Sequence, residues 1–520
     1  MMERVAKAIG IERIVIPVIL CIFITAIGFA HAAETTTSDW PQNDWSVASP
    51  EEEGMDPGAL GVLVQWAKSD NADSLLVIRH GKIVLDAYYA PYRAGIRHDL
   101  RSITKSFIST LTAIAIRDHF LDSVDHLVLD LFQDKAVANI DDRKESMRIQ
   151  HLLDMSSGFE WNEDGYGPNA TLWNMYKSSD ATKFVLDQPM KTAPGHQFYY
   201  NSGNPYILSA LLTRLTGQNA LQFARKELFG PLGISNVEWG KPDQQNVIDG
   251  EARLHLLPHD MAKLGYLYLH QGQWRGAQMI PSSWVERARN GAIDAGHGFS
   301  YGNLWWSMPP KKAYMALGRH NQKIVVIPEA DVVAVLTASL PDGVNIPNGQ
   351  LIDRIVESIK ADKNLSVDVT GTSLLNAALQ SAAKESPDTV TQAPSLASQI
   401  SGKTIDFSNN PLHLKSLTLN LIGPNPSWSA SSDKSADDKT IEVDGGPLGL
   451  NGIFPDEPFR EHVPIVKGRW LSATTFEAKS RMLDQSITAR WIFRFNGEKV
   501  ELHFEDGDGF NVDIQGTAEH

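Results

Sequence analysis

The fold of this chain follows from one stretch, Arg101-Ser102-Ile103-Thr104-Lys105-Ser106, which places a serine hydroxyl and a lysine amine three residues apart. The apolar run after it, 107–116, contains no glycine or proline and predicts a buried or half-buried helix. Residues i and i+3 lie on one face of a helix, so the side chains of Ser102 and Lys105 can meet. The same spacing recurs by chance in long chains, so its meaning depends on segments further along.

A second segment, Phe198-Tyr199-Tyr200-Asn201-Ser202, carries groups that a serine–lysine pair needs, and an apolar helix is expected directly after it over 206–215. Serine is weakly acidic and lysine is protonated at neutral pH, so neither starts acylation unaided. A nearby tyrosine and partial burial would lower the lysine pKa, and either group could then take the serine proton. We expect Tyr199 to be the tyrosine that lies beside Lys105 and shares the proton transfer with it. We expect Asn201 to orient Lys105 or the substrate amide. The alternative is that Tyr199 is a packed aromatic in a tyrosine-rich loop.

The length and charge of the chain limit the classes of protein it can belong to. Its 520 residues are too many for one hydrophobic core and predict two or three domains. Hydrophobic residues make up 42% and charged residues 21%, as in ordinary globular proteins. The formal net charge of -15 argues against a nucleic acid or an anionic membrane as a partner.

Residues 1–32 are predicted to be a secretory signal, because a basic start and an apolar run precede the small-x-small triplet Ala30-His31-Ala32. Cleavage there would give a periplasmic or secreted protein, and the alternative is an uncleaved helix that anchors it in the inner membrane. The only cysteine, Cys21, lies in this segment, so a cleaved chain has no thiol for catalysis, disulfides or metal binding. The sixteen histidines show no paired ligand spacing, and no metal or other cofactor is expected.

Two pairs of apolar segments far apart in the chain predict β-hairpins, one within 75–85 and one within 323–336. Between them the chain is mostly helical with long loops, and an amphipathic helix is expected over 351–360. We therefore predict an α+β fold for residues 45–362, with an antiparallel sheet flanked by helices and an inserted all-helical lobe.

The composition changes after residue 362. Serine, threonine, alanine, glutamine and proline dominate 363–398, which we interpret as a linker that could contain one short helix over 374–384. Further along, apolar and polar residues alternate in 489–495, and Asn496-Gly497 then gives a strong hairpin signal. Residues 399–520 are expected to form a separate, mainly β domain, whose role as an interaction domain, lid or oligomer contact the sequence leaves open.

Spaced segments within residues 45–362 resemble the β-lactamase-related serine hydrolases. This group holds class C β-lactamases, D-Ala-D-Ala carboxypeptidases, certain esterases and 6-aminohexanoate-dimer hydrolase. The matching segments are, in chain order, 101–107, 151–158, 194–203, 228–234, 260–265 and 301–306. Trp161-Asn162-Glu163 and the paired Trp305-Trp306 favour the 6-aminohexanoate-dimer hydrolase branch. The resemblance implies a two-lobed fold, a serine nucleophile and no metal.

The third motif of that family departs from its usual form here. The family usually carries Lys-Thr-Gly or His-x-Gly on the strand beside the nucleophile, and those places are held by Arg319, His320 and Asn321. Arginine keeps a positive charge that could hold a substrate carboxylate, whereas asparagine in the glycine place would hinder close approach. The resemblance also implies an oxyanion hole from the backbone N–H groups of Ser102 and Gln322. The alternative is that Arg319 and His320 form a solvated pair beside the cleft.

Two other motifs fit their functional patterns less well. Gly298-Phe299-Ser300-Tyr301-Gly302 matches G-x-S-x-G, but the glycine-rich sequence before it is not a central strand and no helix cap follows it. Asp506-Gly507-Asp508-Gly509 resembles the opening of a calcium loop but lacks the later ligands, so a hairpin turn is expected.

The sequence therefore predicts a secreted serine hydrolase that cleaves an ester or amide bond of a small molecule. Ser102 is the expected nucleophile, and Lys105 and Tyr199 exchange its proton as a coupled pair. Esters, linear amides, D-Ala-D-Ala peptides and β-lactams all fit these residues, and fold alone does not choose among them. The alternative function is a catalytically weak penicillin-binding-like protein for cell-wall or protein recognition. The oligomeric state stays open.

Overall fold

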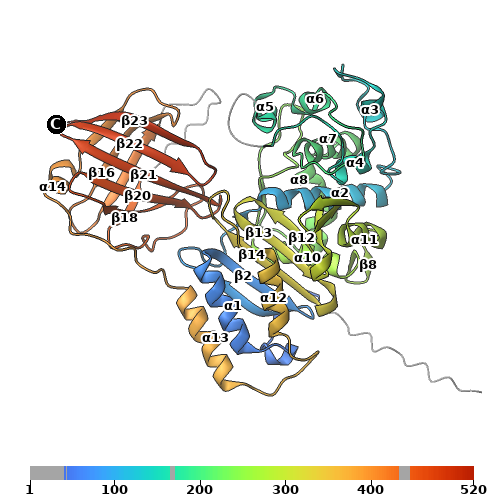
Figure 1. Ribbon diagram of the computed structural model, residues 1–520, viewed down its shortest axis with the longest axis horizontal. Coiled ribbons are helices and arrows are strands. Elements are labelled where there is room, and N and C mark those ends of the chain that lie inside the picture. Colours follow the sequence, from blue (N-terminus) through green and yellow to red (C-terminus); the bar gives the residue numbers. More distant parts are fainter. Residues whose placement is uncertain (1–39, 42–43, 164–169, 433–444, 520) are drawn as a thin grey trace, which may run out of the picture. The chain divides into compact units, whose positions relative to one another are not determined.

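The computed structural model describes residues 40–41, 44–163, 170–432 and 445–519 (Figure 1). The expected secretory signal over 1–32, which includes Cys21, lies outside these residues. Within the described ranges, no helix is both long enough and apolar enough to cross a membrane.

A nine-stranded sheet forms the centre of the first domain, with the strand order β1-β3-β2-β14-β13-β12-β11-β10-β9. The strands are β1 Ser46–Val47, β2 Ala72–Arg79, β3 Lys82–Tyr88, β9 Ile293–Gly296, β10 Phe299–Gly302, β11 Trp305–Met308, β12 Ala313–Gly318, β13 Gln322–Ile327 and β14 Val332–Ala338. Both expected hairpins are present, and β14 pairs antiparallel with β2, so the two distant segments meet in one sheet. The predicted antiparallel α+β architecture is confirmed, with β1 and β3 as a parallel pair at one edge.

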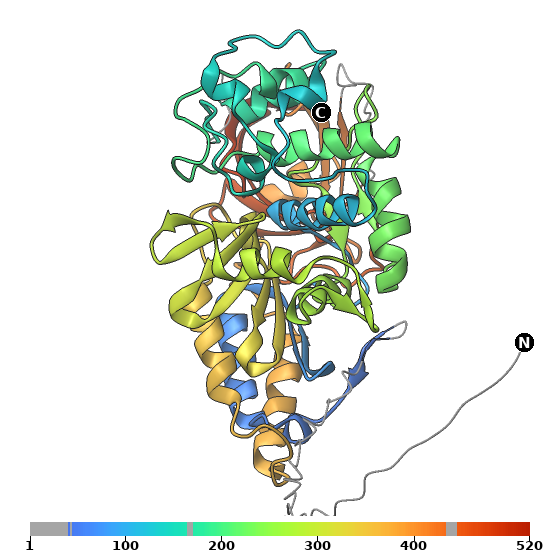
Figure 2. The same ribbon diagram turned by 90° about the vertical axis from the view of Figure 1, so that its right-hand side faces the viewer.

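Helices cover both faces of this sheet. On β14, Val333 and Val335 belong to one apolar cluster and Ala334 to the other, as the alternation of side chains along a strand requires. The first face carries α2 Thr104–Arg117 and α10 Pro258–Leu269, and the second carries α1 Pro57–Ser69, α12 Asn348–Ser358 and α13 Val369–Ala382. In Figures 1 and 2 the blue helix α1 lies beside the orange helices of the later chain.

The inserted lobe is helical, as predicted, and lies between β3 and β9 in the chain. Its longest helix is α7, which packs against α2. The lobe contains α3 Asp142–Glu145, α4 Ile149–Leu153, α5 Thr171–Lys177, α6 Ala181–Leu186, α7 Gly203–Thr216, α8 Ala220–Ala224 and α9 Gly230–Leu232. Among the elements that follow before the sheet resumes are β6 Leu254–Leu256, which pairs with β4 His98–Asp99 and β5 Glu238–Trp239, and the helices α10 and α11 Ser282–Asn290.

The segment 363–398 is more than the linker that its composition suggested. Helix α13 within it packs along α1, and Leu375 and Ala378 are buried in the same cluster as Leu63. The two helices approach closely at Gly61, where an added Cβ would lie 3.2 Å from the Cα of Leu375. The first domain therefore includes this helix, which begins earlier than the short helix expected over 374–384 and packs into the core.

The C-terminal domain is a closed β-barrel, which confirms the predicted mainly β character. Its strands are β15 Thr404–Phe407, β16 Leu414–Asn420, β17 Ser427–Ser432, β18 Gly446–Gly449, β19 Ile465–Trp470, β20 Thr475–Met482, β21 Ile487–Asn496, β22 Lys499–Asp506 and β23 Asn511–Ala518. The Asn496-Gly497 turn joins β21 to β22 as expected, and β15 pairs with β23 to close the barrel. Alternate residues such as Phe476 and Ala478 face an apolar interior.

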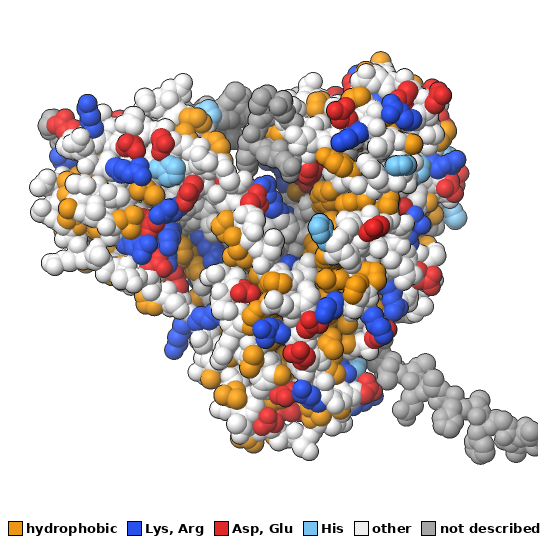
Figure 3. Space-filling view, in the orientation of Figure 1, with side chains coloured by type: hydrophobic (Ala, Val, Ile, Leu, Met, Phe, Trp, Pro, Cys, Tyr) orange, Lys and Arg blue, Asp and Glu red, His pale blue; other side chains and the backbone are white. Residues whose placement is uncertain are grey.

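Charged side chains of both signs are mixed on the molecular face drawn in Figure 3. Lys and Arg side chains lie among Asp and Glu side chains over this face.

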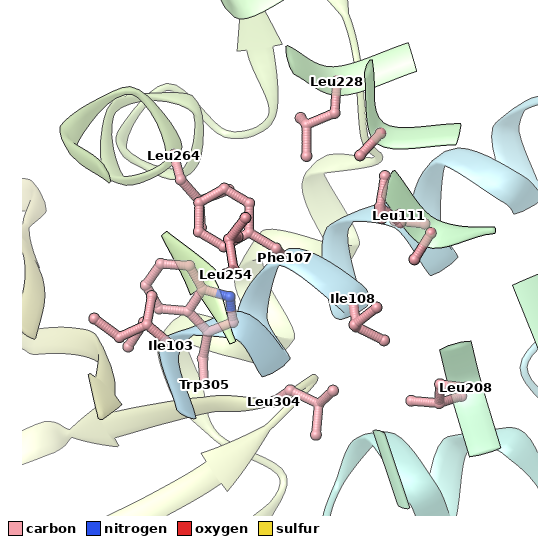
Figure 4. Close-up of a cluster of buried hydrophobic side chains, with 14 of the residues drawn as sticks. Ile103, Phe107, Ile108, Leu111, Leu208, Leu228, Leu254, Leu264, Leu304 and Trp305 are labelled. Carbon is pink, nitrogen blue, oxygen red and sulfur yellow. The ribbon is translucent and has the colours of Figure 1, made fainter. Parts of the chain in front are cut away.

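Helix α2 is fixed by apolar side chains that converge on it from several elements (Figure 4). Ile103, Phe107 and Leu111 point into a cluster that also receives Leu264 from α10 and Trp305 from β11. Each of these side chains is fully buried or nearly so. Packing on this side leaves the opposite side of the first turn, with Ser102 and Lys105, for polar contacts.

Replacing Phe107 with alanine is expected to lower the free energy of unfolding by about 3 to 5 kcal/mol, because a fully buried aromatic ring is lost and a cavity remains. Equilibrium unfolding in guanidinium chloride measures this change. Val62→Ala on the exposed side of α1, where the valine is 57% exposed, is the control and should change stability by less than about 0.5 kcal/mol. Equal effects of the two variants would contradict the packing described for α2.

Candidate active site

The predicted serine and lysine meet at the start of α2. Residues Arg101–Ile103 form a 3-10 turn that leads directly into the helix, and Lys105 lies in the first turn. The Lys105 Nζ lies 2.8 Å from the Ser102 Oγ, and the lysine side chain is 1% exposed. The i, i+3 geometry expected from the sequence is therefore present.

The tyrosine beside this pair is Tyr200 and not Tyr199. The Tyr199 side chain is 37% exposed, and its hydroxyl donates to the Trp161 carbonyl oxygen at 2.7 Å, away from the pair. The Lys105 Nζ lies 5.2 Å from the centre of the Tyr200 ring, and the Ser102 side chain is close enough to the Tyr200 phenol to oppose the rise in its pKa that burial causes. Neighbouring side chains of this loop point in opposite directions, so Tyr199 faces away from the serine–lysine pair while Tyr200 faces it. The assignment to Tyr199 is corrected to Tyr200 on this geometry.

The ammonium of Lys105 is stabilised here, against the lowered pKa expected from the sequence. Its three donors reach the Ser102 Oγ at 2.8 Å, the Glu251 carbonyl oxygen at 2.9 Å and the Glu251 Oε2 at 2.9 Å. Burial by itself lowers the pKa of Lys105, but the Glu251 carboxylate outweighs it and raises that pKa above its ordinary value. Burial also raises the pKa of Tyr200, although the charge of Lys105 and the hydrogen bond with Ser102 oppose this shift.

Two glutamates to which the sequence assigned no role in the site lie near Lys105. Glu251 precedes β6, and Glu163 follows Trp161 in the loop that carries the Trp161-Asn162-Glu163 segment. The Ser202 Oγ contacts both carboxylates, Glu163 through Oε1 and Glu251 through Oε2 at 3.2 Å. Burial raises the pKa of the Glu163 carboxyl, and the Lys105 charge only partly offsets this shift. The distance along the chain between these residues explains why local spacing could not find them.

Asn201 does not orient Lys105 in this structure. Its side-chain oxygen accepts a hydrogen bond from the Gly203 N–H at 2.7 Å, so it holds the first turn of α7. The three donors of Lys105 are already bound to Ser102 and Glu251. A contact of Asn201 with Lys105 therefore has no support here, and the expectation that Asn201 orients the substrate amide stays a prediction; Ser202 is the residue that contacts the charged groups.

A family model described as Beta-lactamase matches residues 51–353, which is more than half of the chain. The chain belongs to the Beta-lactamase family. Within this family, it is 22% identical over 358 residues to the 6-aminohexanoate-dimer hydrolase of Paenarthrobacter ureafaciens, covering 60% of this chain and 90% of the relative. The predicted resemblance and the predicted serine-hydrolase class are thereby confirmed.

A solved structure of a candidate 6-aminohexanoate-dimer hydrolase from Bacillus anthracis has the same fold as this Beta-lactamase family member. It superposes with a TM-score of 0.51 at 20% identity, over 62% of this chain and 88% of that chain. At this identity the match shows the fold and says nothing of the substrate.

The residues that replace the third family motif face protein groups. The Arg319 Nε donates to the Asp342 Oδ1 at 2.6 Å, and its guanidinium lies 3.2 Å from the Asp508 Oδ1. The buried His320 ring contacts the Leu340 carbonyl oxygen at 2.7 Å and the Asp508 Oδ1 at 2.8 Å. Because these contacts occupy the charged atoms, the expected binding of a substrate carboxylate by Arg319 and His320 has no support in this Beta-lactamase family member.

Asn321 fits the place that glycine usually holds. Its φ is 72° and that of His320 is 62°, in the left-handed region that asparagine tolerates better than most side chains. The Asn321 side chain donates to the Val344 carbonyl oxygen and accepts from the Ile346 N–H, both at 2.8 Å. The asparagine therefore holds the start of β13 in place and does not distort it.

Gln322 begins β13 close to the 3-10 turn that carries Ser102. Its cross-strand partner is Gly318, where an added Cβ would lie 2.3 Å from the Leu100 carbonyl oxygen. The strand end thus abuts the residues that lead into Ser102, and only glycine permits that approach. The Gln322 side chain itself points to the Ala338 carbonyl oxygen at 2.6 Å.

The weaker motifs take structural roles. Ser300 lies within β10 between two antiparallel neighbours, without the strand-to-helix turn that a nucleophile elbow requires. The Asp506 Oδ1 accepts from the N–H groups of Asp508 and Phe510, which closes the expected β22–β23 hairpin. His320, Asp342 and Asp508 bring ligand atoms within 4.8 Å, and the Arg319 guanidinium forms ion pairs with both carboxylates, so contacts within the protein account for this cluster.

Proposed function

We propose that the chain hydrolyses an ester or amide bond of a small molecule through an acyl-enzyme on Ser102. The observation that carries this proposal is the 2.8 Å contact between the Lys105 Nζ and the Ser102 Oγ beside Tyr200. The Ser102 Oγ bonds to the substrate carbonyl carbon while its proton passes to the Lys105–Tyr200 pair. The pair returns that proton to the leaving group as its bond to carbon breaks, and water then releases the acyl group.

The carbonyl oxygen becomes negative in this step and needs hydrogen-bond donors. The backbone N–H groups of Ser102 and Gln322 are the donors we propose, each worth about 3 kcal/mol of barrier. The close approach of Gly318 to Leu100 supports this proposal, because it brings the end of the β12–β13 hairpin beside the turn that carries Ser102.

A secreted or periplasmic location is part of the proposal. It rests on the basic start, the apolar run and the small-x-small triplet of residues 1–32. A hydrolase with no thiol after cleavage would also be insensitive to the oxidising conditions outside the cytoplasm.

A fluorophosphonate probe tests the nucleophile directly. One covalent adduct per chain is expected, and mass mapping should place it on the peptide that contains Ser102. The Ser102→Ala protein should take up no label. Equal labelling of the two proteins would show that the nucleophile lies elsewhere, and no labelling of either would favour the penicillin-binding-like recognition function.

A further inference from the structure

Glu251 supplies two of the three hydrogen-bond acceptors of Lys105. Its carbonyl oxygen and its Oε2 both lie 2.9 Å from the Lys105 Nζ, and its side chain is 8% exposed. The third acceptor is the Ser102 Oγ. The position of the lysine relative to the nucleophile therefore depends on a residue that lies 146 positions further along the chain.

The Glu251 carboxylate is itself held by hydroxyl groups from two other segments. Its Oε1 accepts from the Tyr176 hydroxyl on α5, and its Oε2 accepts from the Ser202 hydroxyl at 3.2 Å. Burial raises the pKa of Glu251, but the Lys105 charge and these hydrogen bonds outweigh it and hold that pKa below its ordinary value. The carboxylate is therefore ionised at neutral pH, where Lys105 is charged.

Stability alone does not account for this ion pair. Two buried charges lose their hydration, and replacing such a pair by apolar side chains is often neutral or stabilising. The pair lies in the first turn of α2, one hydrogen bond from the proposed nucleophile. Buried charged groups with specific partners are characteristic of functional sites, and this pair has that character.

We infer that Glu251 is a positioning residue, which holds Lys105 beside Ser102 as an ammonium through the neutral pH range and leaves Tyr200 to exchange the serine proton. This inference rests on the proposed function. The ammonium orients the Ser102 hydroxyl and offsets part of the rise in the Tyr200 pKa that burial causes, because a positive neighbour stabilises a phenolate. When Ser102 bonds to the carbonyl carbon, its proton moves to the Tyr200 oxygen, and from there to the leaving group.

The other charged groups around Lys105 are held by their own partners. The Glu163 carboxylate accepts from the Ser202 N–H at 3.0 Å and from the Trp161 indole at 2.6 Å. Asp249 accepts from the Glu251 N–H at 3.0 Å and lies 3.4 Å from the Arg253 Nε. Of these carboxylates, Glu251 is the one in direct contact with the Lys105 Nζ.

Glu251→Gln tests the inference, since glutamine keeps the shape and removes the charge. Burial would then dominate, and the Lys105 pKa would fall below its ordinary value. The ammonium would be lost as pH rises through that lower pKa. We expect the alkaline limb of kcat/KM to move down by at least about 2 pH units, measured with a chromogenic short-chain ester from about pH 6 to about pH 10.

Two further variants control for a merely structural role. Glu251→Asp keeps the charge and should restore much of the alkaline limb, whereas Glu163→Gln should shift that limb less, because the Glu163 charge also raises the Lys105 pKa but Glu163 does not contact the Lys105 Nζ. An alkaline limb that stays in place in Glu251→Gln would overturn the inference, and so would equal shifts in Glu251→Gln and Glu163→Gln. Labelling of Ser102 is measured on the same proteins, so a nucleophile elsewhere is recognised separately from a failure of the Glu251 role.

Discussion

Replacing Ser102 with alanine is expected to lower kcat/KM for ester hydrolysis by about 10⁵-fold, because the group that forms the acyl-enzyme is lost. The fold should be unaffected. The Ser102 side chain contributes one acceptor to Lys105, whose ammonium keeps its two contacts with Glu251. Initial rates over a range of substrate concentrations measure the loss, and circular dichroism checks the fold.

Ser300→Ala is the matched control for this experiment. Ser300 is the central residue of the G-x-S-x-G match, and it lies within β10 of the sheet. Its removal should leave hydrolysis close to the wild-type rate. Loss of activity in Ser300→Ala with retention in Ser102→Ala would refute the assignment of the nucleophile.

The sheet and α2 could be predicted because their signals are local. Apolar alternation and short turns specify hairpins such as β2–β3 and β13–β14, and the uninterrupted apolar run specifies the helix that carries Lys105. Pairing of β14 with β2 followed from the need of both hairpins to bury two apolar faces. The helix α13 was expected only as a short helix over 374–384 within a linker, because its exposed side is rich in serine, threonine and alanine and its packing on α1 leaves no local signal.

Only the part of the site that lies within one local motif could be predicted. Ser102 and Lys105 share one helical turn, so their meeting follows from geometry. The sign of the Lys105 pKa shift depends on Glu251, which local spacing cannot locate. The contacts of Arg319 and His320 with Asp508 likewise join segments almost two hundred residues apart along the chain. Charged residues that are far apart in the chain but in contact in the fold set the pKa values of the site, and they leave no periodic pattern in the sequence.

The two neighbouring tyrosines show the same limit within a single loop. Both lie in the sequence segment that precedes α7, and the Tyr-x-Asn spacing selected Tyr199. The direction of the backbone decides which tyrosine faces the serine–lysine pair. The hydroxyl of Tyr199 donates to the Trp161 carbonyl oxygen. Tyr200 stacks on Trp306 with ring centres 6.0 Å apart and lies beside Ser102. A side chain one position away in an extended loop faces the opposite way.

Tyr200→Phe is expected to lower kcat/KM by about 10² to 10⁴, the usual contribution of a general acid–base group. The ring, its stacking on Trp306 and its contact with Lys105 are kept, so only the hydroxyl that exchanges the serine proton is lost. KM should change little, because the phenol acts on the reacting atoms and not on the bound substrate as a whole. Steady-state kinetics with one ester and one amide measure both constants.

Tyr199→Phe is the control that the chain itself offers, one residue away and with the same change. It removes the hydrogen bond to the Trp161 carbonyl oxygen, which should cost about 1 kcal/mol of stability and leave kcat/KM close to wild type. The comparison separates proton exchange from loop stability, since both variants lose one hydroxyl from the same loop. A larger loss of kcat in Tyr199→Phe than in Tyr200→Phe would return the acid–base role to Tyr199. It would also mean that the loop turns over when substrate binds, because the Tyr199 hydroxyl faces away from Ser102 in this structure.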